Sequence, residues 1–482
     1  MDLKVVYFVL GRLALAEAVI MLIPLIMAIF NADSAVVAFT VAAGLSAALG
    51  LVLRSQAKKE PERITVREGV AITAGGWALA SVLSMLPYVC GGYLKILDAL
   101  LESISGLTGT GGTVFPTLEV LPASILFWRM LTHYFGGLGI IVIFIALLPQ
   151  TGQSTVHMYN AEKSSAGGDR VMPRLRDMTK ALFTLYLSFT GIAMLVYFAC
   201  GLSLWDALTH AMSTIGTGGF SNYDSNVIHF DNLPLEMAMT FFMVAAGGNF
   251  ALYYRARLKG MAVLLKNTEF RAYIGILTGA TILITLNLVA AGVEPLNALR
   301  YVSFQVGSLS TTGFVSADFE TWPAFSKIIL LTLMIVGGCA GSTAGGMKVA
   351  RIVILVQNAW TIARQKLAPR QIVELRVNGS KVTPAEVTRV GQFFVLYMGF
   401  IALFTLIFTA DGMRLFDALG LSVTTMGNVG PAFGIVGATS TYAVLSDFSK
   451  SAVCVSMLLG RLEMFTLLVM LTPDFWQRGD RW

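Results

Sequence analysis

The feature that most constrains this chain is a succession of apolar runs that fills nearly its whole length. A helix of about 20 apolar residues spans the hydrocarbon core of a bilayer. Only 13% of the residues are charged, whereas soluble domains carry about 25%. The runs lie near 5–30, 35–53, 69–89, 124–149, 179–200, 233–256, 270–292, 324–356, 389–410 and 449–472. The chain is therefore predicted to be an integral, multi-pass membrane protein without a large soluble domain.

The first run is predicted to stay in the protein. No small-residue cleavage site follows it, so a retained helix is favoured over a signal peptide, and it forms a hairpin at 5–53 with the second run. The cysteines show no metal-ligand spacing and are interpreted as small buried hydrophobes: Cys90, Cys200, Cys339 and Cys454. The four histidines show no such spacing either.

Shorter apolar segments alternate with the long ones. They lie near 96–107, 203–214, 297–309 and 414–425. About 12 residues cannot cross a bilayer, so re-entrant half-helices are predicted. Each begins beside a residue expected to cap it: Asp98, Asp206, Asn297 and Asp417.

Each short segment ends in a loop rich in Gly and Thr. The loops contain "SGLTGTGGTVF", "STIGTGGFSNYD", "SLSTTGFVSAD" and "TTMGNVGPAFG". Aligning them on the glycine that ends each tetrapeptide gives Thr108, Gly109, Thr110 and Gly111; Ile215, Gly216, Thr217 and Gly218; Ser310, Thr311, Thr312 and Gly313; and Gly427, Asn428, Val429 and Gly430. Four copies in phase favour a common role over the alternative, which is close helix packing through small residues.

The repeat predicts an all-α integral membrane protein. Four pseudo-symmetric helix–pore-loop–helix repeats would surround a central pore beside the N-terminal hairpin, with ten spanning helices and four re-entrant ones. The predicted boundaries are 1–60 for the hairpin and 61–160, 161–265, 266–370 and 371–482 for the four repeats.

The distribution of Lys and Arg predicts the topology. Basic clusters lie at 54–68, 150–180, 254–271 and 347–389, and the opposite loops hold few bases. By the positive-inside rule both termini are cytoplasmic and the half-helices enter from outside. The net charge of +6 is thus a topology signal, and no nucleic-acid partner is expected. Acids on the outer side would concentrate cations at the mouth: Asp98, Glu102, Glu119, Asp206, Asp224, Asp231, Glu236, Glu294, Asp318, Glu320, Asp411, Asp417 and Asp447.

The chemistry of the loops indicates cation conduction. Irregular backbone at membrane depth is tolerated where it is buried in protein or lines a water-filled path. A ring of backbone carbonyls can replace the hydration shell of a passing potassium ion. The loops are therefore predicted to form a selectivity filter that binds potassium.

The loops, together with "GGLGIIVIFIALLP" at 136–149, "GGCAGSTAGGMKVAR" at 337–351 and "LLGRLEMF" at 458–465, resemble the Trk/Ktr/HKT superfamily of cation transporters. The resemblance covers essentially the whole chain and is closest to the TrkH membrane subunits of its Trk branch. It implies potassium uptake across the bacterial inner membrane, a homodimer and a cytoplasmic, ring-forming, nucleotide-binding regulatory subunit of TrkA type. Potassium is the transported ion, and no organic cofactor is implied.

The resemblance also implies roles for single residues. Gly111, Gly218, Gly313 and Gly430 become the filter glycines. In plant relatives a Ser at the first of them accompanies sodium selectivity, so four glycines imply potassium selectivity. Gly109 replaces a Thr that is usual in the Trk branch, and looser discrimination among cations is expected from it.

A second glycine-rich segment is predicted to gate the pore. Residues 337–346 hold five glycines and would form a loop inside the third inner helix, since glycine costs helix stability. The family occludes the pore with this loop, and tight helix packing is the alternative. The loop residues are Gly337, Gly338, Cys339, Ala340, Gly341, Ser342, Thr343, Ala344, Gly345 and Gly346.

Three basic residues follow or face this loop. Arg461 lies in an apolar helix, and the family places it in the pore beneath the filter as an electrostatic barrier. The alternative is an ion pair with Glu463 or with lipid headgroups. Lys348 and Arg351 are expected to be cytoplasmic anchors or contacts of the regulatory subunit.

Other functions stay open at this point. A proton- or sodium-coupled potassium symporter would need a titratable pair in the pathway. A non-conducting receptor or scaffold would leave the four matched loops unexplained. No catalytic constellation stands out, so an enzyme is not expected. The polar stretch at 360–388 is either a docking surface or a plain linker.

Overall fold

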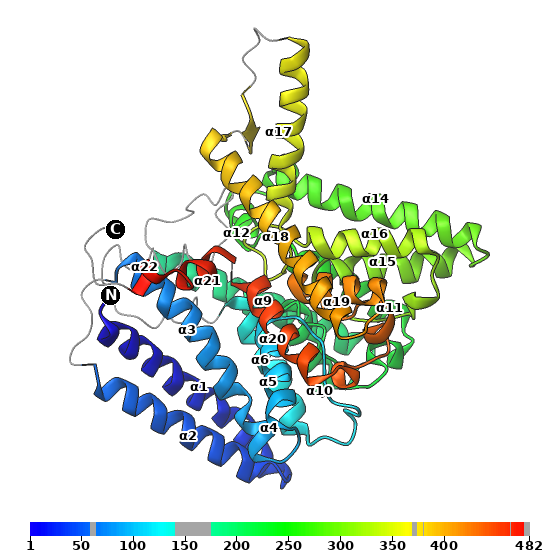
Figure 1. Cartoon of the computed structure of the whole chain (residues 1–482). Helices are drawn as coiled ribbons and strands as arrows, with labels where there is room; N and C mark the ends of the chain where they lie inside the picture. The colour runs from blue at the N-terminus through cyan, green and yellow to red at the C-terminus, as the bar shows by residue number, and fades with distance from the viewer. Residues whose placement is uncertain (58–63, 140–174, 369–373, 379, 463, 477–482) are drawn as a thin grey trace.

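The computed structural model describes residues 1–57, 64–139, 175–368, 374–378, 380–462 and 464–476. Helices dominate these residues, and the one sheet among them is the two-stranded hairpin of β1 (Arg376–Val377) and β2 (Ser380–Lys381). The predicted all-α membrane fold is confirmed (Figure 1).

The N-terminal hairpin consists of α1 (Leu3–Asn31) and α2 (Val36–Ser55), which lie side by side with α3 (Figure 1). Its helices cross closely at two glycines. A β-carbon built on Gly11 would lie 2.9 Å from the Gly50 carbonyl oxygen, and one on Gly50 would lie 2.9 Å from the Gly11 oxygen. Small residues at the crossing let the two backbones approach, as in other membrane helix pairs.

The first helix of each repeat is a continuous span. These helices are α3 (Val66–Ser84) with the short α4 (Leu86–Cys90), α9 (Leu175–Ala199), α14 (Thr268–Ala290) and α18 (Pro384–Ala410). Together with α1 and α2 they account for the 6 helices of the described chain that are long and apolar enough to cross a membrane.

The four predicted half-helices are present. They are α5 (Ile96–Thr108), α10 (Leu204–Ile215), α15 (Pro295–Thr311) and α19 (Leu415–Gly427). The predicted caps are wrong at the side-chain level. Asp98 accepts from the Lys450 ammonium at 2.7 Å, Asp417 pairs with Arg414 at 3.0 Å, and Ser203 caps α10. Aspartates do lie in the first turns of three half-helices, where the helix dipole favours them.

The second helix of each repeat ends or bends at a glycine. α6 (Ala123–Leu138) ends just after Gly136 and Gly137. α11 (Leu233–Ala246) meets α12 (Phe250–Lys259) at 92°, and α20 (Asp447–Arg461) meets α21 (Met464–Met470) at 112°. α16 (Ala324–Val336) is separated from α17 (Val349–Leu367) by a loop.

The sequence predicted an interruption in the third repeat alone. The runs at 233–256 and 449–472, which were predicted to be continuous spans, are instead each broken into two helices. Each break contains two consecutive residues of which at least one is glycine, a residue that disfavours a helix. The pairs are Gly136–Gly137, Gly247–Gly248, Gly337–Gly338 and Gly460–Arg461. The C-terminal ends of half-helices press against the breaks in the first and fourth repeats. A β-carbon on Gly137 would lie 2.7 Å from the Gly216 carbonyl oxygen, at the end of α10.

The remaining elements are short. They are α13 (Ala262–Lys266), α22 (Pro473–Trp476) and the 3-10 turns η1 (Asn226–Phe230), η2 (Phe319–Thr321), η3 (Gly434–Val436) and η4 (Tyr442–Val444). α17 projects away from the helical body (Figure 1). Beyond it, Lys381 and Arg376 lie 2.7 and 2.9 Å from the carboxylate of Glu374. Their hydrogen bonds, and next their charges, lower the pKa of Glu374 to about 2.

Several predicted features fall on residues that the structure does not describe. They include the boundaries at 60–61, 160–161 and 370–371, the end of the run at 124–149, and most of the basic segment at 150–180. The boundary at 265–266 coincides with the end of α13.

Candidate functional site

The four Gly/Thr loops meet in a closed ring. Each loop has a glycine of positive φ whose side-chain position is occupied by a backbone carbonyl of the next loop. The contacts run from Gly111 to the Gly218 carbonyl, from Gly219 to the Thr312 carbonyl, from Gly313 to the Val429 carbonyl and from Gly430 to the Thr110 carbonyl. The ring therefore closes in chain order, with the fourth loop returning to the first.

The second loop lies in a register one residue later than the sequence alignment assumed. Its positive-φ glycine is Gly219 (φ 77°), and Gly218 supplies the carbonyl that meets the first loop. Gly219 was missed because the alignment ended the tetrapeptide "IGTG" at Gly218, the first of two consecutive glycines. The Gly–Phe pairs at 219–220 and 313–314 were the signal that gives the observed register.

Glycine is required at these four positions for two reasons. The φ values of the ring glycines lie between 77° and 104°, a region that residues with a β-carbon rarely occupy. A β-carbon on Gly219 would also lie 2.5 Å from the Thr312 oxygen. Any side chain would thus push a carbonyl of the neighbouring loop out of the ring.

Gly109 lies two residues before Gly111 and has φ 69°. The residues two before the ring glycine in the second and fourth loops, Thr217 and Asn428, have φ 51° and 52°. A β-branched residue is strained in this conformation, whereas glycine is not. Gly109 therefore relieves backbone strain in the first loop, and its expected effect on ion discrimination stays a prediction.

Polar side chains behind the ring fasten neighbouring loops together. The Asn428 amide donates to the Thr110 hydroxyl at 3.1 Å and to the Met457 carbonyl at 3.0 Å. Thr110 and Thr108 share a hydrogen bond of 2.7 Å between their hydroxyls. The Tyr442 hydroxyl donates to the Gly430 carbonyl at 2.6 Å. Tyr442 was not anticipated, because an isolated Tyr far from the loop gives no sequence signal.

A buried ion pair supports the first loop. Glu102 and Arg129 are both 0% exposed and lie 2.7 Å apart. Glu102 also accepts from the Val114 amide at 2.8 Å, and Arg129 donates to the Ser221 carbonyl at 3.1 Å. The pair thus links the exits of the first and second loops, and Glu102 does not belong to a solvated ring of acids at the mouth.

We expect Arg129→Met to cost about 3–5 kcal/mol of folding free energy, because it leaves the Glu102 charge buried without its partner. The double variant Arg129→Met/Glu102→Gln removes both charges and should recover most of that loss. Thermal unfolding in detergent measures both. An Arg129→Met protein as stable as the parent would contradict the structural role of the pair.

Other outer acids are paired as well. Glu236 and Asp231 hold Arg300 at 2.6 and 2.8 Å, and Lys327 binds Glu320 at 3.1 Å. Together with the pairs of Asp98 and Asp417, these contacts neutralise much of the expected acidic mouth. The rest of the predicted outer acids are Asp206, which is 8% exposed and accepts from the Asn222 amide at 3.0 Å, and the exposed Glu119, Asp224, Glu294, Asp318, Asp411 and Asp447.

The predicted gating segment is an irregular loop over 337–348, between α16 and α17. Its middle lies against the ends of two half-helices. The Thr343 hydroxyl donates to the Ile215 carbonyl at 3.1 Å, at the end of α10. The Gly427 carbonyl, at the end of α19, occupies the place where a side chain of Gly345 would stand. The loop therefore lies directly next to the ring.

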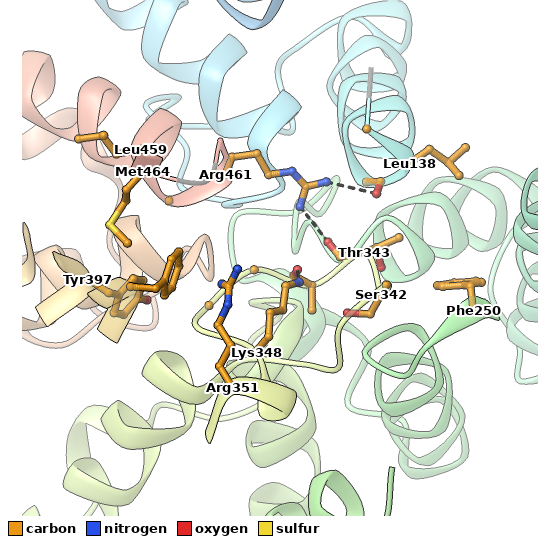
Figure 2. A pocket seen from close by; sticks show the side chains of 18 of the residues that line it. Leu138, Phe250, Ser342, Thr343, Lys348, Arg351, Tyr397, Leu459, Arg461 and Met464 are labelled. Carbon is orange, nitrogen blue, oxygen red and sulfur yellow. Dashed lines mark hydrogen bonds between the residues drawn. The ribbon is translucent and has the colours of Figure 1, made fainter. Parts of the chain in front are cut away.

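Arg461 joins this loop to the first repeat. Its guanidinium donates to the Gly136 and Gly137 carbonyls at 2.6 and 3.2 Å. It also donates to the Thr343 carbonyl at 3.0 Å (Figure 2). It is the last residue of α20, not a residue within a continuous helix. It stands where the other three repeats have the second glycine of the break, so it reaches across the centre from that position.

A cavity of about 170 Å³ lies beside Arg461. It is lined by the loop, the ends of α6 and α20, and aromatic residues that include Tyr186 and Phe393. Lys348 and Arg351 also line it (Figure 2). Their expected place as cytoplasmic anchors is therefore corrected: Arg351 is 6% exposed and stacks over the Phe393 ring at 3.7 Å, and the Lys348 ammonium donates to the Ala344 carbonyl.

Two expectations about this region are not addressed by the structure. Glu463, the alternative partner of Arg461, and residues 140–149 of the first inner-helix motif lie outside the described residues. Among the residues that are described, no group of three or more His, Cys, Asp or Glu side chains is placed to hold a metal ion.

Comparison with known proteins gives concordant matches. The family model TrkH, described as a cation transport protein, matches residues 35–478. The Trk system potassium uptake protein TrkH of Halomonas elongata is 32% identical over 484 residues, which covers 99% of this chain and 100% of that protein. TrkH of Escherichia coli K12 is 33% identical with 99% and 100% coverage. The crystal structure of the potassium transporter TrkH from Vibrio parahaemolyticus superposes with a TM-score of 0.89 at 32% identity, over 99% of this chain and 100% of that one.

Proposed function

This chain belongs to the TrkH family of cation transport proteins, and from that premise we propose that it takes up potassium through a channel-like pore. Its relatives are named as potassium uptake proteins, which indicates transport rather than catalysis. The observation that carries the proposal is the closed ring of four loops, in which each ring glycine packs against a carbonyl of the next loop.

We propose that this ring is the selectivity filter. It comprises the four tetrapeptides predicted from the sequence together with Gly219. A potassium ion would exchange its hydration shell for backbone carbonyls, at a spacing fixed by the contacts between loops. The hydroxyl and amide groups of Thr110, Asn428 and Tyr442 hold the ring from behind, so its size is resistant to collapse around a smaller ion.

Loop 337–348 and Arg461 form the proposed gate. The loop lies between the ends of two half-helices, and Arg461 ties it to α6. A fixed guanidinium beside a narrow path repels a cation. In this proposal the loop in its present contacts is the closed gate, and conduction requires the loop to leave them.

The assembly is proposed on the same premise. The relatives belong to a system named Trk, so a cytoplasmic nucleotide-binding subunit of TrkA type would regulate the gate, and two copies of this chain would pair. The protein would lie in the bacterial inner membrane with both termini in the cytoplasm. α17 and the hairpin beyond it, which project from the helical body (Figure 1), are the proposed docking surface.

Flux through the purified protein in liposomes tests the proposal. We expect potassium and rubidium to pass, with sodium and lithium slower, because the ring geometry fits the larger ions. A variant with loop 337–346 shortened serves as the open control. If no cation gradient drives flux through either protein, the pore interpretation is wrong.

A further inference from the structure

A buried carboxylate at the start of α14 has no role in the site described so far. Glu269 is 5% exposed and is the second residue of this helix, which Asn267 caps by accepting from the Phe270 amide at 2.9 Å. Burying a carboxylate costs free energy unless hydrogen-bond donors satisfy it. The donors that Glu269 contacts therefore indicate what it does.

The groups around this carboxylate lie in the intramembrane loop or directly after it. The Ala340 amide, near the start of the loop, donates to the Glu269 carboxylate at 2.5 Å. The Ala350 amide, in the first turn of α17, and the Lys348 ammonium are both close enough to interact with the same carboxylate. One side chain of α14 thus holds the start of the loop by a hydrogen bond and faces the residues at its end.

Other contacts at the start of the loop are between neutral backbone groups. The Cys339 amide donates to the Gly247 carbonyl at 2.8 Å, and the Phe250 amide donates to the Gly341 carbonyl at 3.2 Å. The contact to the Ala340 amide is made instead by a buried side chain of a different helix. Glu269 therefore anchors the start of the loop to α14, as Arg461 anchors its middle to α6 and α20.

We propose that Glu269 is a positioning residue that clamps loop 337–348 in its closed position. Movement of the loop out of the pathway then requires the carboxylate to release the Ala340 amide. The inference rests on the proposed function in one respect, that the position of this loop controls flux. The clamp itself concerns only the position of the loop, which is measured through the accessibility of a loop residue and without any transport assay.

A native cysteine reports on the loop. Cys339 is 0% exposed and adjacent to Ala340. The test uses the full chain in liposomes with Cys90, Cys200 and Cys454 replaced by Ser or Ala, so that Cys339 is the remaining thiol. The measured quantity is the rate at which a small water-soluble methanethiosulfonate modifies it.

We expect Glu269→Ala to raise this rate about tenfold, because the buried Ala340 amide loses its acceptor. Glu269→Gln keeps an oxygen that accepts from the Ala340 amide and should restore most of the protection. If the Ala variant does not fold, Glu269→Asp, which withdraws the carboxylate by one methylene, is expected to raise the rate as well.

Asn378→Ala is the matched control. The Asn378 side chain accepts from the Thr268 amide at 2.7 Å, so this variant loosens the same helical turn without touching the loop. Its modification rate should equal that of the parent. If it exposes Cys339 as much as Glu269→Ala does, the effect comes from fraying of α14, and the clamp is wrong.

Rubidium flux measured on the same samples separates the two hypotheses. Protection of Cys339 that is unchanged in Glu269→Ala overturns the clamp, whether or not the parent transports rubidium. A faster modification rate in a protein that carries no cation would support the clamp and overturn the proposed transport function.

Discussion

Replacing Gly111 by Ser should abolish most of the preference for potassium over sodium. We expect the ratio of the two fluxes in liposomes to fall about tenfold or more, which corresponds to about 1.4 kcal/mol. A side chain at Gly111 occupies the place of the Gly218 carbonyl oxygen. That carbonyl belongs to the ring, so the first and second loops must separate and the spacing of the oxygens must change.

The control separates ring closure from backbone strain. Gly292 has φ 95°, close to the 83° of Gly111, but no atom lies within 4 Å of the position where its β-carbon would stand. Gly292→Ser therefore imposes similar backbone strain outside the ring and should leave selectivity unchanged. Unaltered selectivity in Gly111→Ser would show that the ring does not discriminate between the ions.

Replacing Arg461 by Ala should raise the basal flux of potassium or rubidium at least about tenfold in the absence of other proteins. The substitution removes the hydrogen bonds from the guanidinium to the carbonyls of Thr343, Gly136 and Gly137. It also removes a positive charge from the cavity beneath the ring. The loop loses its anchor and a permeating cation loses its electrostatic barrier.

Two further variants identify which loss matters. Arg461→Lys keeps the charge but cannot reach the three carbonyls in the same geometry, so an intermediate flux is expected. Arg257→Ala removes an exposed arginine at the end of α12 and should leave flux unchanged. A folded Arg461→Ala protein with the basal flux of the parent would exclude Arg461 from the gate.

Much of the architecture was predictable because it depends on local properties of the chain. Apolar length distinguishes the continuous spans from half-helices such as α5 and α10. The repeated Gly/Thr loops predicted irregular backbone at membrane depth, and the five glycines at 337–346 predicted the break between α16 and α17.

The breaks in α11 and α20 were not predicted, although each has a glycine at the bend. One or two glycines are common in membrane helices, and here each bend lies against another segment: the loop 337–348 contacts the break after α11, and the end of α19 contacts the break after α20. A β-carbon on Gly460, for instance, would overlap the Met426 carbonyl near the end of α19. That pressure comes from a segment remote in sequence.

The sequence by itself determined that this protein spans the membrane and carries four half-helices, each followed by a glycine-centred loop, because apolar length and glycine content act locally. Tertiary structure alone decided that Glu102 is buried with Arg129 and that Lys348 and Arg351 line the cavity. Each of these depends on which carbonyl, charge or ring a remote segment brings within contact distance. Such contacts are fixed by the packing of the four repeats around one another, and residue type and spacing do not encode them.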